Sequence, residues 1–143
     1  MSWRCIKLFK KLNYWIQNLV PYGSPDEIGV IQLAWLGDSI WELHQRLKYV
    51  HFPLRSKELH LYVVNEVKAK SQSKSLSQIE HLLNEKEIDL IRRARNKSKR
   101  WPKTIDPTEY SRATGFETLI GWVFLKDPQR LSTLFEHLEI TVY

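Results

Sequence analysis

The stretch QLAWLGDSIWEL, residues 32–43, is apolar on almost every side except for one glycine and two acids. Asp38 directly follows Gly37, and Glu42 lies four residues further on, so a helix places the two carboxylates on one face. Burying a carboxylate among tryptophan and leucine side chains costs several kcal/mol unless it takes up a proton, forms a salt bridge or binds a metal ion. The stretch therefore predicts a helix whose acids need a partner from another part of the chain.

A second apolar stretch, YSRATGFETLIGWVFL at residues 110–125, also carries an acid among hydrophobic neighbours. This acid is Glu117, and Gly115 and Gly121 flank it. Glycines allow two helices to approach closely, so Asp38 and Glu117 are candidates to share a divalent cation. Oxygen ligands with retained waters suit Mg²⁺, and Mg²⁺ beside a basic surface suits phosphodiester hydrolysis. The simpler alternative is that each acid is a boundary residue of its helix, solvated or paired with Arg or Lys.

Positive charge is concentrated in residues 92–103, here called the basic segment. It carries seven Lys and Arg residues and no acid, which is more than the whole net charge of +6. Such a patch is typical of a protein that binds a polyanion. A solvated helix end is the alternative, but two or three cations would satisfy a helix dipole. We predict contacts to the phosphates of such a polyanion from Arg92, Arg93, Arg95, Asn96, Lys97, Lys99 and Arg100, with Lys68, Lys70 and Lys74 extending the surface.

The composition is that of one globular domain of 143 residues, with 43% hydrophobic and 27% charged residues. Its apolar runs are much shorter than the ~20 residues of a membrane span, so we expect none. The single Cys5 excludes an intramolecular disulfide and fits a reducing compartment. Five histidines without an i,i+4 pair make a zinc site unexpected.

Helical periodicity and repeated start signals predict an all-α fold of about seven helices. The start signals are Ser24 with Pro25, Ser56, Asn84 with Glu87, Asp106 with Pro107, and Asp127 with Pro128. We expect one helix through residues 57–76, a short one at 75–83, and a helix into the basic segment that Pro102 ends. In the helix over residues 32–49, an apolar stripe is expected at Leu36, Ile40, Leu43 and Leu47. Core or dimer packing is expected for Trp35, Leu36, Ile40, Phe116, Leu119 and Ile120. Residues 1–22 read as a basic amphipathic helix ahead of a domain at 23–143.

The two acid-bearing stretches together resemble the signature helices of the ribonuclease III catalytic domain. Residues 63–76 (VVNEVKAKSQSKSL) and 87–99 (EIDLIRRARNKSK) extend the likeness, which covers about two-thirds of the chain in four segments. The chain is most similar to the short type without a double-stranded-RNA-binding domain, the Mini-ribonuclease III family.

This resemblance implies an all-helical, homodimeric endonuclease that cuts double-stranded RNA with Mg²⁺ and needs no small-molecule cofactor. The usual substrate of the short family is a stem of the large-subunit (23S) ribosomal RNA precursor, which places the protein in the cytoplasm or the plastid stroma. Carried over to this sequence, the catalytic metal ligands are Asp38 and Glu117, and Glu42 is a further candidate ligand.

Two acids of the longer ribonuclease III enzymes are replaced here by Ala34 and Thr114. That difference leaves open a catalytically inactive protein of the same fold that binds RNA and associates with ribosomes. A helical DNA-binding regulator is a more distant alternative, because no pair of helices is arranged for a major groove.

Overall fold

The computed structural model describes residues 24–139, and in that range the chain forms six α-helices and two short 3₁₀ turns, without a strand. The prediction of an all-α fold is confirmed. The amphipathic helix expected within residues 1–22 lies outside the described residues. The elements in chain order are η1 (Pro25–Glu27), α2 (Val30–Tyr49), α3 (Ser56–Val67), α4 (Ala69–Ile79), η2 (Glu80–Leu82), α5 (Glu85–Lys97), α6 (Pro107–Lys126) and α7 (Pro128–Glu139).

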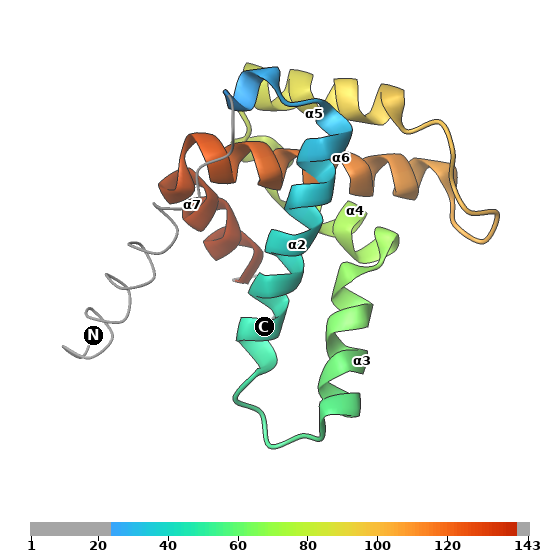
Figure 1. Cartoon of the computed structure of the whole chain (residues 1–143), viewed down its shortest axis with the longest axis vertical. Coiled ribbons are helices and arrows are strands. Elements are labelled where there is room, and N and C mark those ends of the chain that lie inside the picture. Colours follow the sequence, from blue (N-terminus) through green and yellow to red (C-terminus); the bar gives the residue numbers. More distant parts are fainter. Residues whose placement is uncertain (1–23, 140–143) are drawn as a thin grey trace.

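Helix α6 is the centre of the molecule. It packs against α2, α4, α5 and α7, and Figure 1 shows α2 crossing it while α5 runs beside it. Phe116, Leu119 and Ile120 of α6 are buried as expected, and Leu76 of α4 and Leu134 of α7 complete the same core. Because neighbours surround α6, a polar side chain on it is either paired or held at a site.

Three of the predicted helix starts are confirmed by cap hydrogen bonds. The Asn84 side chain accepts from the Glu87 backbone N–H at 2.9 Å, and the Glu87 carboxylate accepts from Asn84 N–H at 3.0 Å. Asp106 caps α6 by accepting from Glu109 N–H at 2.9 Å. Asp127 accepts from the Arg130 N–H at 3.1 Å at the start of α7. Asp106 is therefore occupied as a cap.

Other helix boundaries differ from the prediction. Ser24 makes no side-chain cap bond, and the turn after it is 3₁₀, so the next long helix begins only at Val30. The cap of α3 is Arg55 rather than Ser56, with the Glu58 carboxylate accepting from Arg55 N–H at 2.9 Å. Helix α5 ends before Pro102 is reached, and the stretch 75–83 is divided between α4 and η2.

Helices α3 and α4 were expected to be one helix, and the structure separates them at Lys68, whose ψ is 148°. Carbonyl groups freed at the break are satisfied by side chains. Trp41 Nε1 donates to the Glu66 carbonyl at 3.2 Å, and Ser71 Oγ donates to the Asn65 carbonyl at 2.6 Å. The break is thus held by a contact from α2, which local helix propensity does not encode.

The buried face of α2 also differs from the predicted stripe. Leu43 and Leu47 are 48% and 57% exposed, and Leu36 and Ile40 are only partly buried. The face toward the core is instead formed by Val30, Leu33, Ala34, Gly37, Trp41 and Gln45. Small residues in the middle of this face allow α2 to lie directly on α6.

Candidate active site

The two acid-bearing helices touch backbone to backbone at a pair of glycines. A Cβ atom at Gly37 of α2 would overlap the Glu117 carbonyl of α6, and one at Gly121 would overlap the Leu33 carbonyl of α2. Only glycine therefore permits this crossing at both positions. The expectation that glycines bring the helices together is met by Gly37 and Gly121, whereas Gly115 faces Ile91 of α5.

The crossing brings the carboxyl groups of Asp38 and Glu117 close enough for each to shift the pKa of the other. Burial raises the pKa of the Glu117 carboxyl to about 7; the Gln72 amide lowers it, and Asp38 raises it further. Burial and then the charge of Glu42 raise the pKa of Asp38, while its hydrogen bond with Glu117 lowers it. Both shifts favour a pair that shares one proton over a pair of two ionised groups when no cation is present.

No Lys or Arg of residues 24–139 forms an ion pair with Asp38 or Glu117, whereas Glu42 is paired with Arg46 at 2.7 Å. Of the simpler interpretation, solvated or paired acids, the paired form thus describes Glu42 and the solvated form describes the exposed Asp38. Glu117, which is mostly buried, fits neither form. Within the same residues, no three His, Cys, Asp or Glu side chains converge on one point. The site therefore offers two carboxylates, and Glu42 as a ligand stays a prediction.

Two adjacent carboxylates without basic partners fit a hard divalent cation. Mg²⁺ is commonly bound through one or two carboxylates and keeps several waters, so a third protein carboxylate is not required. The cation would replace the shared proton and remove the repulsion between the two ionised groups. Asp38 is exposed at the surface while Glu117 is mostly buried, so the pair is open to solvent on the side of α2.

The raised pKa of Glu117 makes the stability of the metal-free protein depend on pH. Its pKa is about 7 in the folded chain and ordinarily 4.5, so the folded state binds this proton more tightly than the unfolded state. The free energy of unfolding should then fall as pH rises from about 4.5 to above 7, by on the order of 2 kcal/mol. Urea unfolding in EDTA at pH 5 and pH 8 measures this, with Glu117→Gln lacking the effect. If the free energies of unfolding of the wild type and Glu117→Gln differ by the same amount at pH 5 and at pH 8, the prediction is wrong.

Gln72 and Arg112 also lie near the carboxylate pair, and neither was predicted from the sequence. Gln72 of α4 is 1% exposed and faces Glu117. Arg112 of α6 is fastened to α4 through the hydroxyl groups of Ser73 and Ser77. Helical spacing was the available signal, because Gln72 and Ser73 precede Leu76 by four and three residues and therefore share its buried face.

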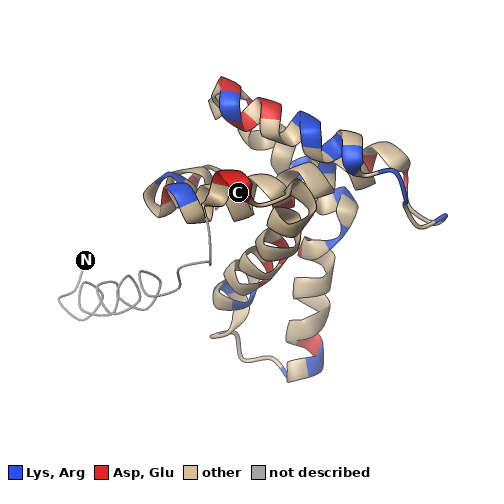
Figure 2. Ribbon diagram, turned by 45° about the horizontal axis from the view of Figure 1, so that its top comes forward, with Lys and Arg blue, Asp and Glu red and all other residues tan. Residues whose placement is uncertain are grey.

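The basic segment begins on α5 and continues into the loop before α6, and Figure 2 shows Lys and Arg along both. Its first residues are partly neutralised, since Arg92 and Arg93 both contact Asp89. Arg95 donates to Ser111 Oγ at 3.3 Å. For Asn96, Lys97, Lys99 and Arg100, no hydrogen bond or ion pair of their side chains is seen within residues 24–139, and all four are exposed.

The end of α5 packs close to the carboxylate pair. Ser98 Oγ lies 3.3 Å from Thr114 Oγ1, and Thr114 precedes Glu117 by three residues on α6. Three residues correspond to about 4.5 Å along a helix. The end of α5, which the exposed cations of the basic segment flank, therefore contacts α6 about one helical turn from Glu117.

The three lysines expected to extend this surface lie elsewhere, around α4. Lys68 Nζ donates to Asn65 Oδ1 at 2.9 Å at the break between α3 and α4. Lys70 is exposed on the first turn of α4. Lys74 lines a cavity of about 330 Å³ together with Lys48 and Gln45 of α2. Their role in RNA binding stays a prediction.

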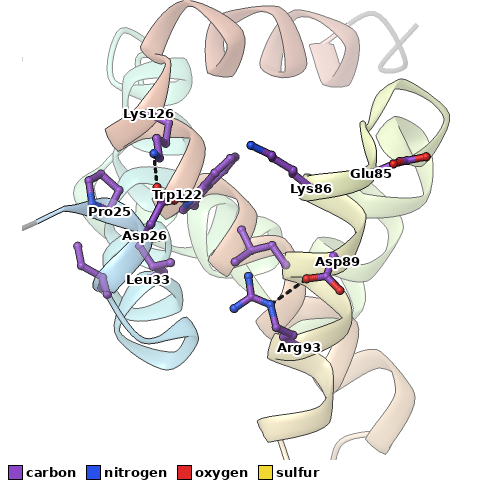
Figure 3. Close-up of a pocket in the computed structure, with 11 residues that line it drawn as sticks. Pro25, Asp26, Leu33, Glu85, Lys86, Asp89, Arg93, Trp122 and Lys126 are labelled. Carbon is purple, nitrogen blue, oxygen red and sulfur yellow. Dashed lines mark hydrogen bonds and ion pairs between the residues drawn. The ribbon is translucent and has the colours of Figure 1, made fainter.

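A larger cavity of about 620 Å³ lies between η1, α5 and the end of α6, and neither Asp38 nor Glu117 lines it. Figure 3 shows Trp122 in its wall and two ion pairs around it: Asp26 with Lys126 at 2.6 Å, and Asp89 with Arg93 at 3.0 Å. Because these acids are already paired with basic side chains, they do not form a site for a cation in this cavity.

Comparisons with known proteins agree with this arrangement. A family model described as the Ribonuclease III domain matches residues 31–128. The chain is 40% identical over 111 residues to the Mini-ribonuclease 3 of a Synechococcus species, covering 78% of this chain and 80% of that protein. It is 33% identical over 128 residues to the Mini-ribonuclease 3 of a Synechocystis species, covering 88% and 90%.

The similarity extends to a distant bacterium and to a solved structure. The Mini-ribonuclease 3 of a Thermoanaerobacter species is 40% identical over 109 residues, which is 73% of this chain and 75% of that protein. The crystal structure of protein FN1578 from Fusobacterium nucleatum superimposes with a TM-score of 0.72 and 32% identity, over 81% of this chain and 93% of that one. The chain therefore belongs to the ribonuclease III family of endoribonucleases, and within it to the Mini-ribonuclease 3 type.

Proposed function

We propose that the protein is a Mg²⁺-dependent endoribonuclease that cuts double-stranded RNA, with Asp38 and Glu117 as its metal ligands. The observation that carries this proposal is the meeting of these two acids, without basic partners in the described part of the chain, at a crossing that only glycines permit. The family supports the substrate class. We further propose the stem of a large-subunit ribosomal RNA precursor as the natural substrate, and the cytoplasm or plastid stroma as the location.

We propose separate tasks for the residues. Asp38 and Glu117 would hold the divalent ion, which supplies Lewis-acid stabilisation of phosphoryl charge and activation of water. Gly37 and Gly121 keep the two acids at a fixed separation. The exposed cations after Arg95 flank the end of α5 that contacts α6 at Thr114, and we propose that they hold phosphates that flank the scissile bond. Within residues 24–139, none of the helices has the length and apolar character that crossing a membrane requires.

The Ala34 and Thr114 positions do not argue for an inactive protein. Ala34 is 5% exposed in the interface with α6, where a carboxylate would be buried. Thr114 donates its hydroxyl to the Tyr110 carbonyl at 3.1 Å and lies beside Ser98. Both side chains thus serve packing, and the acid pair is complete without them.

The proposal is tested by incubating the protein with a plain RNA duplex and Mg²⁺. We expect endonucleolytic products from the RNA duplex, and none from single-stranded RNA, from a DNA duplex or in EDTA. Tight duplex binding without cleavage at any divalent-ion concentration would instead establish the non-enzymatic alternative. Mapping the ribosomal RNA ends that accumulate in cells lacking the protein tests the natural substrate.

A homodimer is proposed from the exposed side of α2. Ile31, Trp35, Leu43 and Leu47 are 46%, 78%, 48% and 57% exposed and lie on one side of the helix. Asp38 follows Ile31 by two helical turns and therefore lies at the edge of the same side. A second copy of the chain on this surface would bury these side chains and place two carboxylate pairs near each other, one for each RNA strand.

The most exposed of these residues provides a test of the dimer. Trp35→Glu should convert the dimer into a monomer, because a charge at the centre of an apolar contact loses its hydration. Sedimentation or light scattering measures the mass, and Trp101→Glu is the matched control, since Trp101 is a 45% exposed tryptophan outside α2. A Trp35→Glu protein that remains dimeric would place the dimer contact on another surface.

RNA binding by the basic segment predicts a change in salt dependence. Replacing Lys97, Lys99 and Arg100 by Ala should weaken duplex binding and reduce the slope of log Kd against log salt by up to about one unit per residue. Duplex binding in EDTA between 50 and 300 mM salt (roughly the useful range for such slopes) measures it. Lys57→Ala is the control, because α3 lies at the opposite end of the molecule from α5 (Figure 1). An unchanged slope in the triple variant would refute the assignment.

A further inference from the structure

A buried glutamine lies beside the carboxylate pair. Gln72 is 1% exposed on the side of α4 that packs against α6, and its Nε2 makes no hydrogen bond of ordinary geometry within the described chain. The side-chain amide faces the Glu117 carboxyl. A buried donor without a full partner destabilises the fold, so packing alone would favour an apolar residue of similar size at this position.

The position of Gln72 is fixed by contacts that fasten α4 to α6. Arg112 of α6 reaches three side chains along α4 and η2: Ser73 Oγ at 3.1 Å, Ser77 Oγ at 2.8 Å and Glu80 at 2.6 Å. Ser73 is the next residue after Gln72, and Arg112 precedes Glu117 by five residues on α6. Arg112 therefore holds α4, which carries Gln72, in register against α6, which carries Glu117.

We propose that Gln72 is a positioning residue of the metal site, whose amide N–H holds one oxygen of the Glu117 carboxylate and leaves the other free to face Asp38. This inference rests on the proposed function, because the ion between the two acids is part of it. A hydrogen bond from an amide to an ionised carboxylate is stronger than one to the neutral acid. The unpartnered Nε2 is a buried donor that can make this hydrogen bond. Second partners of ligating carboxylates typically contribute roughly 10- to 100-fold to metal affinity.

The test is the affinity of the full chain for Mn²⁺, measured by calorimetry or electron paramagnetic resonance in the absence of RNA. Gln72→Leu should weaken Mn²⁺ binding by about 10-fold or more. The matched control is Gln45→Leu, because Gln45 is 3% exposed and its Oε1 also lacks a partner in the described chain, yet it lies on α2 two turns beyond Asp38. This control should bind Mn²⁺ as the wild type does. Thermal unfolding establishes that each variant is folded, and Gln72→Met replaces Gln72→Leu if the leucine side chain does not fit.

A second measurement distinguishes positioning from a general loss of structure. Cleavage of an RNA duplex by Gln72→Leu should require about 10-fold more Mn²⁺ for half-maximal rate, whereas its duplex affinity in EDTA should equal that of the wild type. Unchanged Mn²⁺ affinity in Gln72→Leu, or an equal loss in Gln45→Leu, would overturn the inference. Wild-type protein that binds Mn²⁺ but cuts no duplex would refute the proposed function alone, and wild-type protein that binds no Mn²⁺ would refute both.

Discussion

Asp38→Asn and Glu117→Gln are each expected to reduce cleavage of an RNA duplex by on the order of 10³-fold, which corresponds to about 4 kcal/mol of transition-state stabilisation. The amide side chains keep the volume of the acids but remove the negative charge that would hold the divalent ion. Neither carboxyl group has a basic partner in the described chain, and the nearby Glu42 is engaged by Arg46, so we expect no other side chain there to replace the lost charge fully. The single-turnover cleavage rate at saturating protein and Mg²⁺ is the measurement.

The control for this prediction is Glu42→Gln, on the same face of α2. Because the Glu42 carboxylate is engaged by Arg46 at 2.7 Å, we expect its loss to reduce the rate much less than the loss of Asp38. Unfolding cannot explain inactivity of Glu117→Gln, since removing a buried acid should stabilise the metal-free protein at pH 8. Full activity in either Asp38→Asn or Glu117→Gln would end the catalytic assignment.

Features of the fold that depend on local chemistry were predictable from the sequence. The caps at Asn84, Asp106 and Asp127 form because each side chain accepts a hydrogen bond from a backbone N–H three residues later, within one helical turn. The same holds for the pairing of an acid with glycines on two apolar helices. These signals need no knowledge of the rest of the molecule.

Features that depend on distant contacts were missed. The break at Lys68 interrupts a continuous helical pattern, and a tryptophan of α2 satisfies the freed Glu66 carbonyl. The predicted core face of α2 is wrong, because periodicity favours its leucines as the buried residues. At a close helix crossing, small residues such as Ala34 and Gly37 are buried, and larger ones such as Leu47 remain outside. Sequence periodicity detects large hydrophobic side chains, whereas this helix crossing depends on positions with little or no side chain.

The second large effect is expected from Gly37→Ala and Gly121→Ala, each of which should destabilise the fold by about 3 kcal/mol or more. At both positions the added Cβ would overlap a backbone carbonyl of the facing helix, and backbone cannot move aside as a flexible side chain can. Gly115→Ala on the same helix α6 is the matched control. There the atom nearest to the Cβ would be a side-chain methyl, Ile91 Cγ2 at 2.8 Å, and the backbone oxygen of Ile91 would lie 3.5 Å away. Helix propensity favours alanine over glycine by ~1 kcal/mol at all three positions, so propensity does not explain a difference between them.

Urea unfolding of the three variants separates the effects, and the cleavage rate adds a functional readout. A Gly37→Ala protein that still folds must have moved α2 away from α6, which separates Asp38 from Glu117, so its activity should fall more than its stability explains. Gly115→Ala should lose less stability than Gly37→Ala and should keep its activity, since its clash is with a side-chain methyl rather than with backbone and helix propensity favours alanine. If Gly37→Ala unfolds at the same urea concentration as Gly115→Ala, the helices do not meet at these glycines, and the shared site of Asp38 and Glu117 loses its structural basis.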